Sequence, residues 1–98
     1  MQVNVSARHG QLQSGDQELI VEKAAKLRRL YERVNSIEVT VDLEKQDHPA
    51  VEIVVHGEGC DDVVATADST TVIAALDTAI PKAEQQLRKI KDKKTKHH

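Results

Sequence analysis

Apolar and polar residues alternate strictly over residues 37–44, and this pattern constrains the fold more than any other feature of the sequence. The apolar positions are Ile37, Val39, Val41 and Leu43, and each is followed by a polar residue. A period of two is typical of a β-strand with one buried face and one solvated face. The chain therefore needs a second layer that covers one face of a sheet.

Three further segments are predicted to be strands of the same sheet. Residues 2–7 alternate around Val3 and Val5, residues 51–55 alternate again, and residues of about 61–67 form the last apolar run of this kind. Turns are expected at residues 45–49 and at residues 56–59, where two glycines occur.

Two segments have apolar residues at helical spacing. The first follows a capping-box pattern formed by Ser14 and Gln17, and we expect it to run to about Val34. Its apolar stripe is Ile20, Ala24, Leu27, Tyr31 and Val34. The second is expected to be capped by Asp68 or Ser69 and to keep its apolar pattern to Ile90. Proline removes a backbone donor, so Pro81 predicts a kink near residues 77–80.

The predicted order is β-α-β-β-β-α, an α+β fold with two layers. A right-handed crossover makes the first two strands parallel, and the remaining strands are antiparallel, which gives a four-stranded mixed sheet. Each strand has one apolar face, so both helices must pack on the same face. The arrangement is similar to a double-stranded-RNA-binding domain. We expect one domain over residues 1–98, with residues 91–98 as a frayed basic tail.

Charge is strongly segregated along the chain, although the net charge is only −2. Residues 23–34 carry five basic residues against Glu32, and residues 82–98 carry seven against two acidic ones. Residues 35–81 carry one lysine against ten carboxylates. The predicted helix layer is therefore cationic and the open sheet face anionic, which suits docking of one face on a polyanion. A merely solvated helical surface remains the alternative interpretation.

Composition excludes several classes of function. Tyr31 is the only aromatic residue, which excludes binding that stacks several bases on aromatic rings, as well as an aromatic cage. The single cysteine excludes an intramolecular disulfide and CxxC metal sites. The first ten residues lack the apolar segment of a signal peptide, and no stretch approaches the roughly 20 apolar residues of a membrane helix. We expect a cytoplasmic protein.

No catalytic or metal-binding pattern stands out. Cys60 and His56 are four residues apart, but an inert thiol in a turn is the simpler interpretation. Strand alternation points Asp61 and Asp62 to opposite faces. His9, His48 and His56 have no metal-ligand spacing, and the two C-terminal histidines, His97 and His98, are compatible only with weak metal binding. An enzyme is the class of function least expected.

The sequence as a whole resembles the family of short bacterial ribosome hibernation promoting factors and protein Y (ribosome-associated inhibitor A). The segments that carry the resemblance are MQVNVSA, EKAAKLRRLYERVNSIEVTVDLEK, VEIVVHG and AALDTAIPKAEQQLRKIKDK. The sequence departs from the family at Ile73, where an aromatic residue is frequent, and at Pro81, where proline is not usual.

The resemblance implies the β-α-β-β-β-α fold and a role in translation. Members bind the small (30S) ribosomal subunit during stress or stationary phase, in the channel for mRNA and tRNA, and silence translation. Some act with a separate ribosome modulation factor. No cofactor, metal, membrane or small-molecule substrate is implied. The positions that would contact 16S ribosomal RNA are Lys23, Lys26, Arg29, Arg33, Lys82, Arg88, Lys89, Lys91 and Lys93.

Two other functions stay open on the sequence. One is a generic module for double-stranded RNA, and the other is a protein-interaction domain that uses the acidic sheet face.

Overall fold

The computed structural model of the protein describes residues 2–95, which form four strands, two α-helices and one 3-10 helix. In chain order these are β1 (Gln2–Arg8), α1 (Asp16–Ala25), the 3-10 helix η1 (Lys26–Leu30), β2 (Val34–Asp42), β3 (Ala50–Gly57), β4 (Val63–Asp68) and α2 (Val72–Thr95). The predicted β-α-β-β-β-α order is confirmed.

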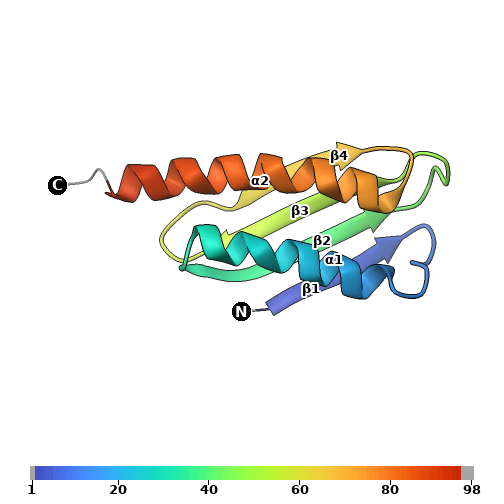
Figure 1. Ribbon diagram of the computed structural model, residues 1–98, viewed down its shortest axis with the longest axis horizontal. Helices are drawn as coiled ribbons and strands as arrows, with labels where there is room; N and C mark the ends of the chain where they lie inside the picture. Colours follow the sequence, from blue (N-terminus) through green and yellow to red (C-terminus); the bar gives the residue numbers. More distant parts are fainter. Residues whose placement is uncertain (1, 96–98) are drawn as a thin grey trace.

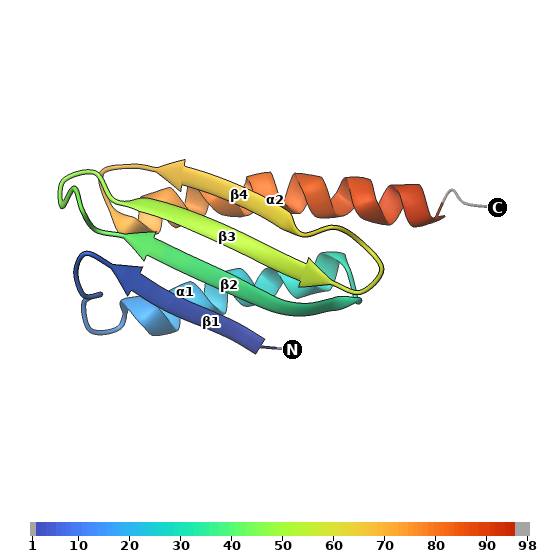
Figure 2. The ribbon, with the colours of Figure 1, turned by 180° about the vertical axis from the view of Figure 1, so that it is seen from behind.

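The strands form one mixed sheet in the order β1-β2-β3-β4. β1 is parallel to β2, whereas β2–β3 and β3–β4 are antiparallel. The register aligns Val5 with Val39, Val39 with Ile53, and Ile53 with Ala65. One apolar row therefore crosses all four strands on the same face, while the other face is open to solvent (Figure 2).

Both helices cover the apolar face of the sheet. α1 lies over β1 and β2, α2 lies over β3 and β4, and η1 packs against α2 (Figure 1). The core beneath them consists of valine, isoleucine, leucine and alanine side chains, with Tyr31 as its one aromatic residue. The predicted two-layer α+β fold, with both helices on one face, is thus confirmed.

The first helical segment ends earlier than predicted. α1 stops at Ala25, η1 carries the chain to Leu30, Tyr31 is extended, and Val34 already belongs to β2. Tyr31 and Val34 are nevertheless buried, as their place in the apolar stripe predicted. The prediction of the element was wrong because Val34 pairs with Gly57 across the sheet, and this pairing satisfies its burial equally well.

Both predicted helix caps were also wrong. Gly15 occupies the N-cap of α1 with φ 88°, a left-handed conformation that glycine adopts without steric cost, and no side chain caps this end. The hydroxyl of Thr71 accepts a hydrogen bond from the Ala74 N–H at 3.1 Å and so caps α2. Asp68 instead ends β4, and the Ser69 N–H donates to the carbonyl of Pro49.

α2 passes through Pro81 without a break and is assigned as a single helix from Val72 to Thr95, and Figure 1 draws it as one continuous ribbon. Proline leaves the carbonyl of Asp77 without its helical donor, but Pro81 is exposed, so water can bond to that carbonyl. The helix also continues past Ile90 to Thr95, since lysine is a good helix former and needs no packing there. Residues 96–98 of the predicted tail lie outside the described residues.

Candidate nucleic-acid interface

η1 presents two exposed cations side by side. Side chains three residues apart eclipse each other in a 3-10 helix, so Lys26 and Arg29 share one side and Leu27 and Leu30 share another. Leu27 is fully buried and Leu30 partly buried, whereas Lys26 and Arg29 are exposed. The core side chains therefore hold the two cations outward on a rigid support.

Lys23 joins the two helices. Its ammonium lies 2.9 Å from a carboxylate oxygen of Asp77 on α2, and 28% of its side chain is exposed. This lysine is already engaged by the protein, so it is a weaker candidate for a ligand contact than Lys26 or Arg29.

Arg33 is not on a helix, contrary to prediction. It lies in the turn between η1 and β2, where its carbonyl accepts the Glu58 N–H at 2.9 Å. Its side chain is exposed, and its position after the end of η1 separates it from the helical side that Lys26 and Arg29 share. The early end of the helix causes this difference.

The cations of α2 lie on two flanks of the helix. Lys82 donates to the carbonyl of Thr66, and Gln86 donates to the carbonyl of Val64, each at 2.9 Å, so this flank covers the edge of β4. Lys89 follows Lys82 by two helical turns and lies on the same flank. We call Lys82 and Lys89 the edge cations.

Arg88 lies on the flank that faces α1. It contacts Glu84 at 3.7 Å, and Glu84 follows Asp77, the partner of Lys23, by two turns. Lys91 is exposed near the same side. Lys93 belongs to the backbone of α2, but its side chain lies outside the described residues. We call Lys26, Arg29 and Arg88 the α1-side cations.

The structure thus places Lys23 on α1 and places Lys26 and Arg29 on η1, whereas Arg33 lies in a turn. It divides Lys82, Lys89 and Arg88 between two flanks of α2. It also adds Arg28, which lines a shallow hollow together with Arg29, Ala25 and Glu32. The adjacent arginines at positions 28 and 29 are the sequence signal that could have found it.

The open sheet face has the opposite chemistry. Arg8 is the only lysine or arginine in the four described strands, against four carboxylates, those of Glu38, Asp42, Glu52 and Asp68. The nearby histidines bond to such carboxylates: His9 to Asp42 at 2.9 Å and His48 to Asp68 at 2.6 Å. The pKa of Asp42 is lowered, first by the Glu44 backbone N–H and then by His9.

His56 bridges two carboxylates. Its Nε2 lies 2.8 Å from Glu38 on β2, and its Nδ1 lies 2.9 Å from Asp62 in the β3–β4 connection. These hydrogen bonds, first to Glu38 and then to Asp62, raise the pKa of the imidazole above its usual value. Because both ring nitrogens are used, His56 is not aimed at Cys60, and the two do not form a nucleophile–base pair.

Comparison with known proteins decides the family. Residues 3–95 match the model of the family described as Sigma 54 modulation protein / S30EA ribosomal protein. The chain belongs to this family. The resemblance noted in the sequence is therefore confirmed.

Curated relatives in this family cover nearly the whole chain. A ribosome hibernation promoting factor of Escherichia coli K12 is 31% identical over 97 residues, covering 99% of this chain and 100% of the relative. The ribosome hibernation promoting factor of Azotobacter vinelandii is 32% identical over 93 residues, covering 95% of this chain and 85% of the relative.

Solved structures share the fold. A ribosomal subunit interface protein from Coxiella burnetii superimposes with a TM-score of 0.83 at 20% identity, over 94% of this chain and 99% of that one. The N-terminal domain of Thermus thermophilus Protein Y superimposes with a TM-score of 0.78 at 22% identity, over 92% of this chain and 99% of that one.

Neither α-helix within residues 2–95 combines the length and apolar character needed to cross a lipid bilayer.

Proposed function

We propose that this protein is a ribosome hibernation factor that binds the small ribosomal subunit through its helix layer and silences translation. Family membership supports the role, because its curated relatives are named ribosome hibernation promoting factors. The observation that carries the choice of surface is the pair Lys26 and Arg29, exposed on η1 and held outward by buried Leu27.

The physical basis is electrostatic docking without chemistry. Each phosphate that a lysine or arginine neutralises releases condensed counterions, so affinity falls as salt rises. Ribosomal RNA offers a folded surface of phosphates and 2′-hydroxyls, which a rigid cationic face can recognise by shape. The acidic sheet face repels the same polyanion and so fixes which side of the protein approaches it. The proposal assigns no enzymatic activity.

We assign contact with 16S ribosomal RNA to the α1-side cations first and to the edge cations second. Lys23 and Lys82 make contacts within the protein, with Asp77 and with the Thr66 carbonyl, and so have a structural role as well. Arg33, Lys91 and Lys93 remain proposed contacts at the periphery. Binding in the mRNA and tRNA channel of the 30S subunit, in the cytoplasm, would exclude tRNA. A separate modulation factor is a proposed further partner.

The test compares two variants with the same change in charge. K26Q/R29Q removes two α1-side cations, and R8Q/K45Q removes one cation from the open sheet face and one from the β2–β3 loop. Co-sedimentation with 30S subunits across a salt series should weaken at least about ten-fold for K26Q/R29Q and change little for R8Q/K45Q. The salt dependence of K26Q/R29Q should also be shallower, by about one unit of log–log slope per lost phosphate contact.

Equal losses in the two variants would refute the proposed surface, since net charge alone would then explain binding. Unchanged co-sedimentation of K26Q/R29Q would refute it as well. Equally tight binding of the wild type to a free RNA duplex would favour a generic double-stranded-RNA module instead. Sucrose gradients of ribosomes from the same experiment report whether subunits, single ribosomes or dimers accumulate.

A further inference from the structure

Two chain segments are locked together where the parallel strands β1 and β2 end. Carboxyl ends of neighbouring parallel strands meet at one edge of a sheet, so residues 8–10 lie beside residues 42–44. The Leu43 N–H donates to the Arg8 carbonyl at 2.9 Å. A Cβ on Gly10 would lie 3.0 Å from the Leu43 Cβ, so the two backbones are in close contact. The backbones of these two segments therefore hold a fixed spacing.

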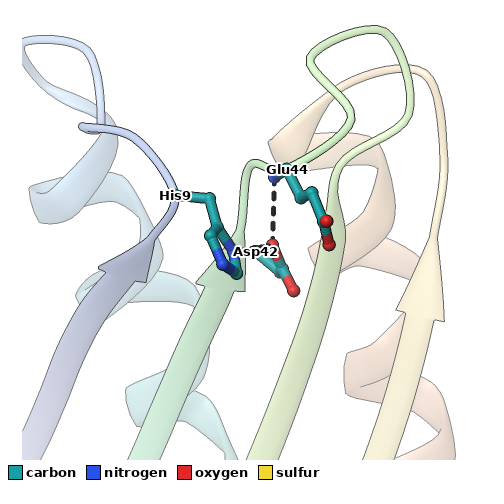
Figure 3. A group of neighbouring side chains, drawn as sticks. All are labelled: His9, Asp42 and Glu44. Atoms are coloured by element: carbon teal, nitrogen blue, oxygen red, sulfur yellow. Dashed lines mark hydrogen bonds and ion pairs between the residues drawn. The ribbon is translucent and has the colours of Figure 1, made fainter.

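Three potential metal ligands converge at this point (Figure 3). One ligand atom from each of His9, Asp42 and Glu44 lies within 4.8 Å of the others. His9 has a positive φ of 62° and directs its Nδ1 to within 2.9 Å of a carboxylate oxygen of Asp42. We propose that His9, Asp42 and Glu44 bind a divalent transition-metal ion of the zinc type.

The other histidine–carboxylate groups lack this convergence, which makes them internal controls. His48 meets one carboxylate, that of Asp68. His56 meets two, but on its two different ring nitrogens, which point in opposite directions and cannot share an ion. Within the residues whose side chains the structure describes, the His9 group is the one where three ligand types face a common point.

The ligand set selects the class of ion. An imidazole nitrogen with two carboxylates suits Zn²⁺ and similar transition metals, whereas Mg²⁺ and Ca²⁺ prefer oxygen ligands throughout. Bonds of about 2.1 Å place tetrahedral ligands about 3.4 Å apart. Ligand atoms that lie up to 4.8 Å apart must therefore close by up to about 1.4 Å. Glu44 is exposed and can move this far. Three protein ligands leave a fourth position for water.

The ion would take the place of the proton that now lies between His9 and Asp42. A neutral imidazole can carry its proton on either nitrogen, so Nδ1 can present a lone pair to an ion while Nε2 keeps the proton. Binding would also connect the end of β1 to the end of β2. Any ligand that binds only the folded chain stabilises it, so the melting temperature should rise with metal concentration.

The experiment titrates the full chain with ZnCl₂ in an H97A/H98A background, which removes the C-terminal histidines as competing ligands. Isothermal titration should give one ion per chain. H9N should lower the affinity at least about ten-fold, and E44Q should lower it too, whereas H48N should leave it within about two-fold. Asparagine is used at position 9 because it tolerates a positive φ, so the backbone is preserved.

A second measurement separates loss of the site from loss of the fold. The melting temperature without metal should be similar in H9N, E44Q and H48N, and only H9N and E44Q should lose the increase caused by ZnCl₂. No saturable binding in the H97A/H98A background would overturn the proposal. Affinity unchanged by H9N, or lowered equally by H48N, would overturn it as well.

Discussion

The helix layer and the open sheet face use their charged residues in opposite ways. On the sheet face, His9, His48 and His56 bond to carboxylates of the same surface. On the helix layer, the side chains of Lys26 and Arg29 make no hydrogen bond or ion pair with the residues whose side chains are described. Each of these three histidines bonds to a carboxylate of its own surface, whereas the side chains of Lys26 and Arg29 remain available to a partner.

The largest expected effect is a loss of stability when the core beneath Lys26 and Arg29 is truncated. Leu27→Ala removes a fully buried side chain beneath Lys26 and Arg29 and should destabilise the fold by about 2–5 kcal/mol. Val64→Thr, on the open face where Val64 is 47% exposed, should change stability by about 0.5 kcal/mol or less. Urea denaturation of both variants measures the difference. Similar losses of unfolding free energy in the two variants would mean that buried Leu27 contributes no more to stability than exposed Val64.

The N-cap of α2 gives the next effect in size. Thr71→Ala removes the hydroxyl that accepts the Ala74 N–H and should cost about 1 kcal/mol of unfolding free energy. Thr71→Ser keeps the hydroxyl and should restore most of that loss. Thermal unfolding followed by circular dichroism checks both variants. Equal stability of the alanine and serine variants would show that the hydrogen bond does not support the helix that carries Arg88 and Lys89.

Removing Asp77, the ion-pair partner of Lys23, should make the helix layer bind a polyanion more tightly. Asp77→Asn leaves the Lys23 ammonium without its ion pair, so the helix layer gains an available cation. Both side chains are partly exposed, so the cost to stability should be below about 1 kcal/mol. Affinity for 30S subunits at low salt should rise. A fall in affinity would show that the ion pair positions the helices for binding.

The smallest expected effect is a pH dependence that arises on the sheet face. The pKa of His56 is raised by hydrogen bonds to Glu38 and Asp62, so the folded state favours the imidazolium. This contribution to stability is fully present below the unfolded pKa of about 6.5, provided the carboxylates are ionised, and is lost as pH rises through the folded value.

The variant that isolates this contribution is His56→Gln. The difference in melting temperature between wild type and His56→Gln should therefore be larger at pH 6 than at pH 9. His48→Gln is the matched control variant, because the ring of His48 bonds to one carboxylate, that of Asp68. A difference that grows towards pH 9 would contradict the assignment.

The sequence predicted the layers of the fold because apolar spacing reports burial directly. Residues of the stripe from Ile20 to Val34 are all buried. Its last two residues are nevertheless not helical, since Tyr31 is extended and Val34 begins β2. Spacing records which side chains face the core but not which backbone brings them there. The same limit explains why a helix that was expected to run to about Val34 put Arg33 on a helix.

The histidine–carboxylate pairs lay beyond sequence reasoning for a different reason. His48 and Asp68 are twenty residues apart, and His9 and Asp42 are separated by thirty-three. Such pairs depend on strand register and on the path of the connecting loops, which no local pattern specifies. The division of the α2 cations between two flanks likewise depends on where the edge of β4 lies, as the Lys82–Thr66 contact shows.

The position of α2 in the chain has a consequence for how the protein is made. Ribosomes synthesise proteins from the N-terminus, so β3 and β4 emerge before the helix that covers them. Until α2 follows, the apolar faces around Ile53 and Ala65 have no cover, and a free strand edge at β4 lacks the donors of Lys82 and Gln86. The nascent chain is thus most prone to aggregation just before its last helix is complete.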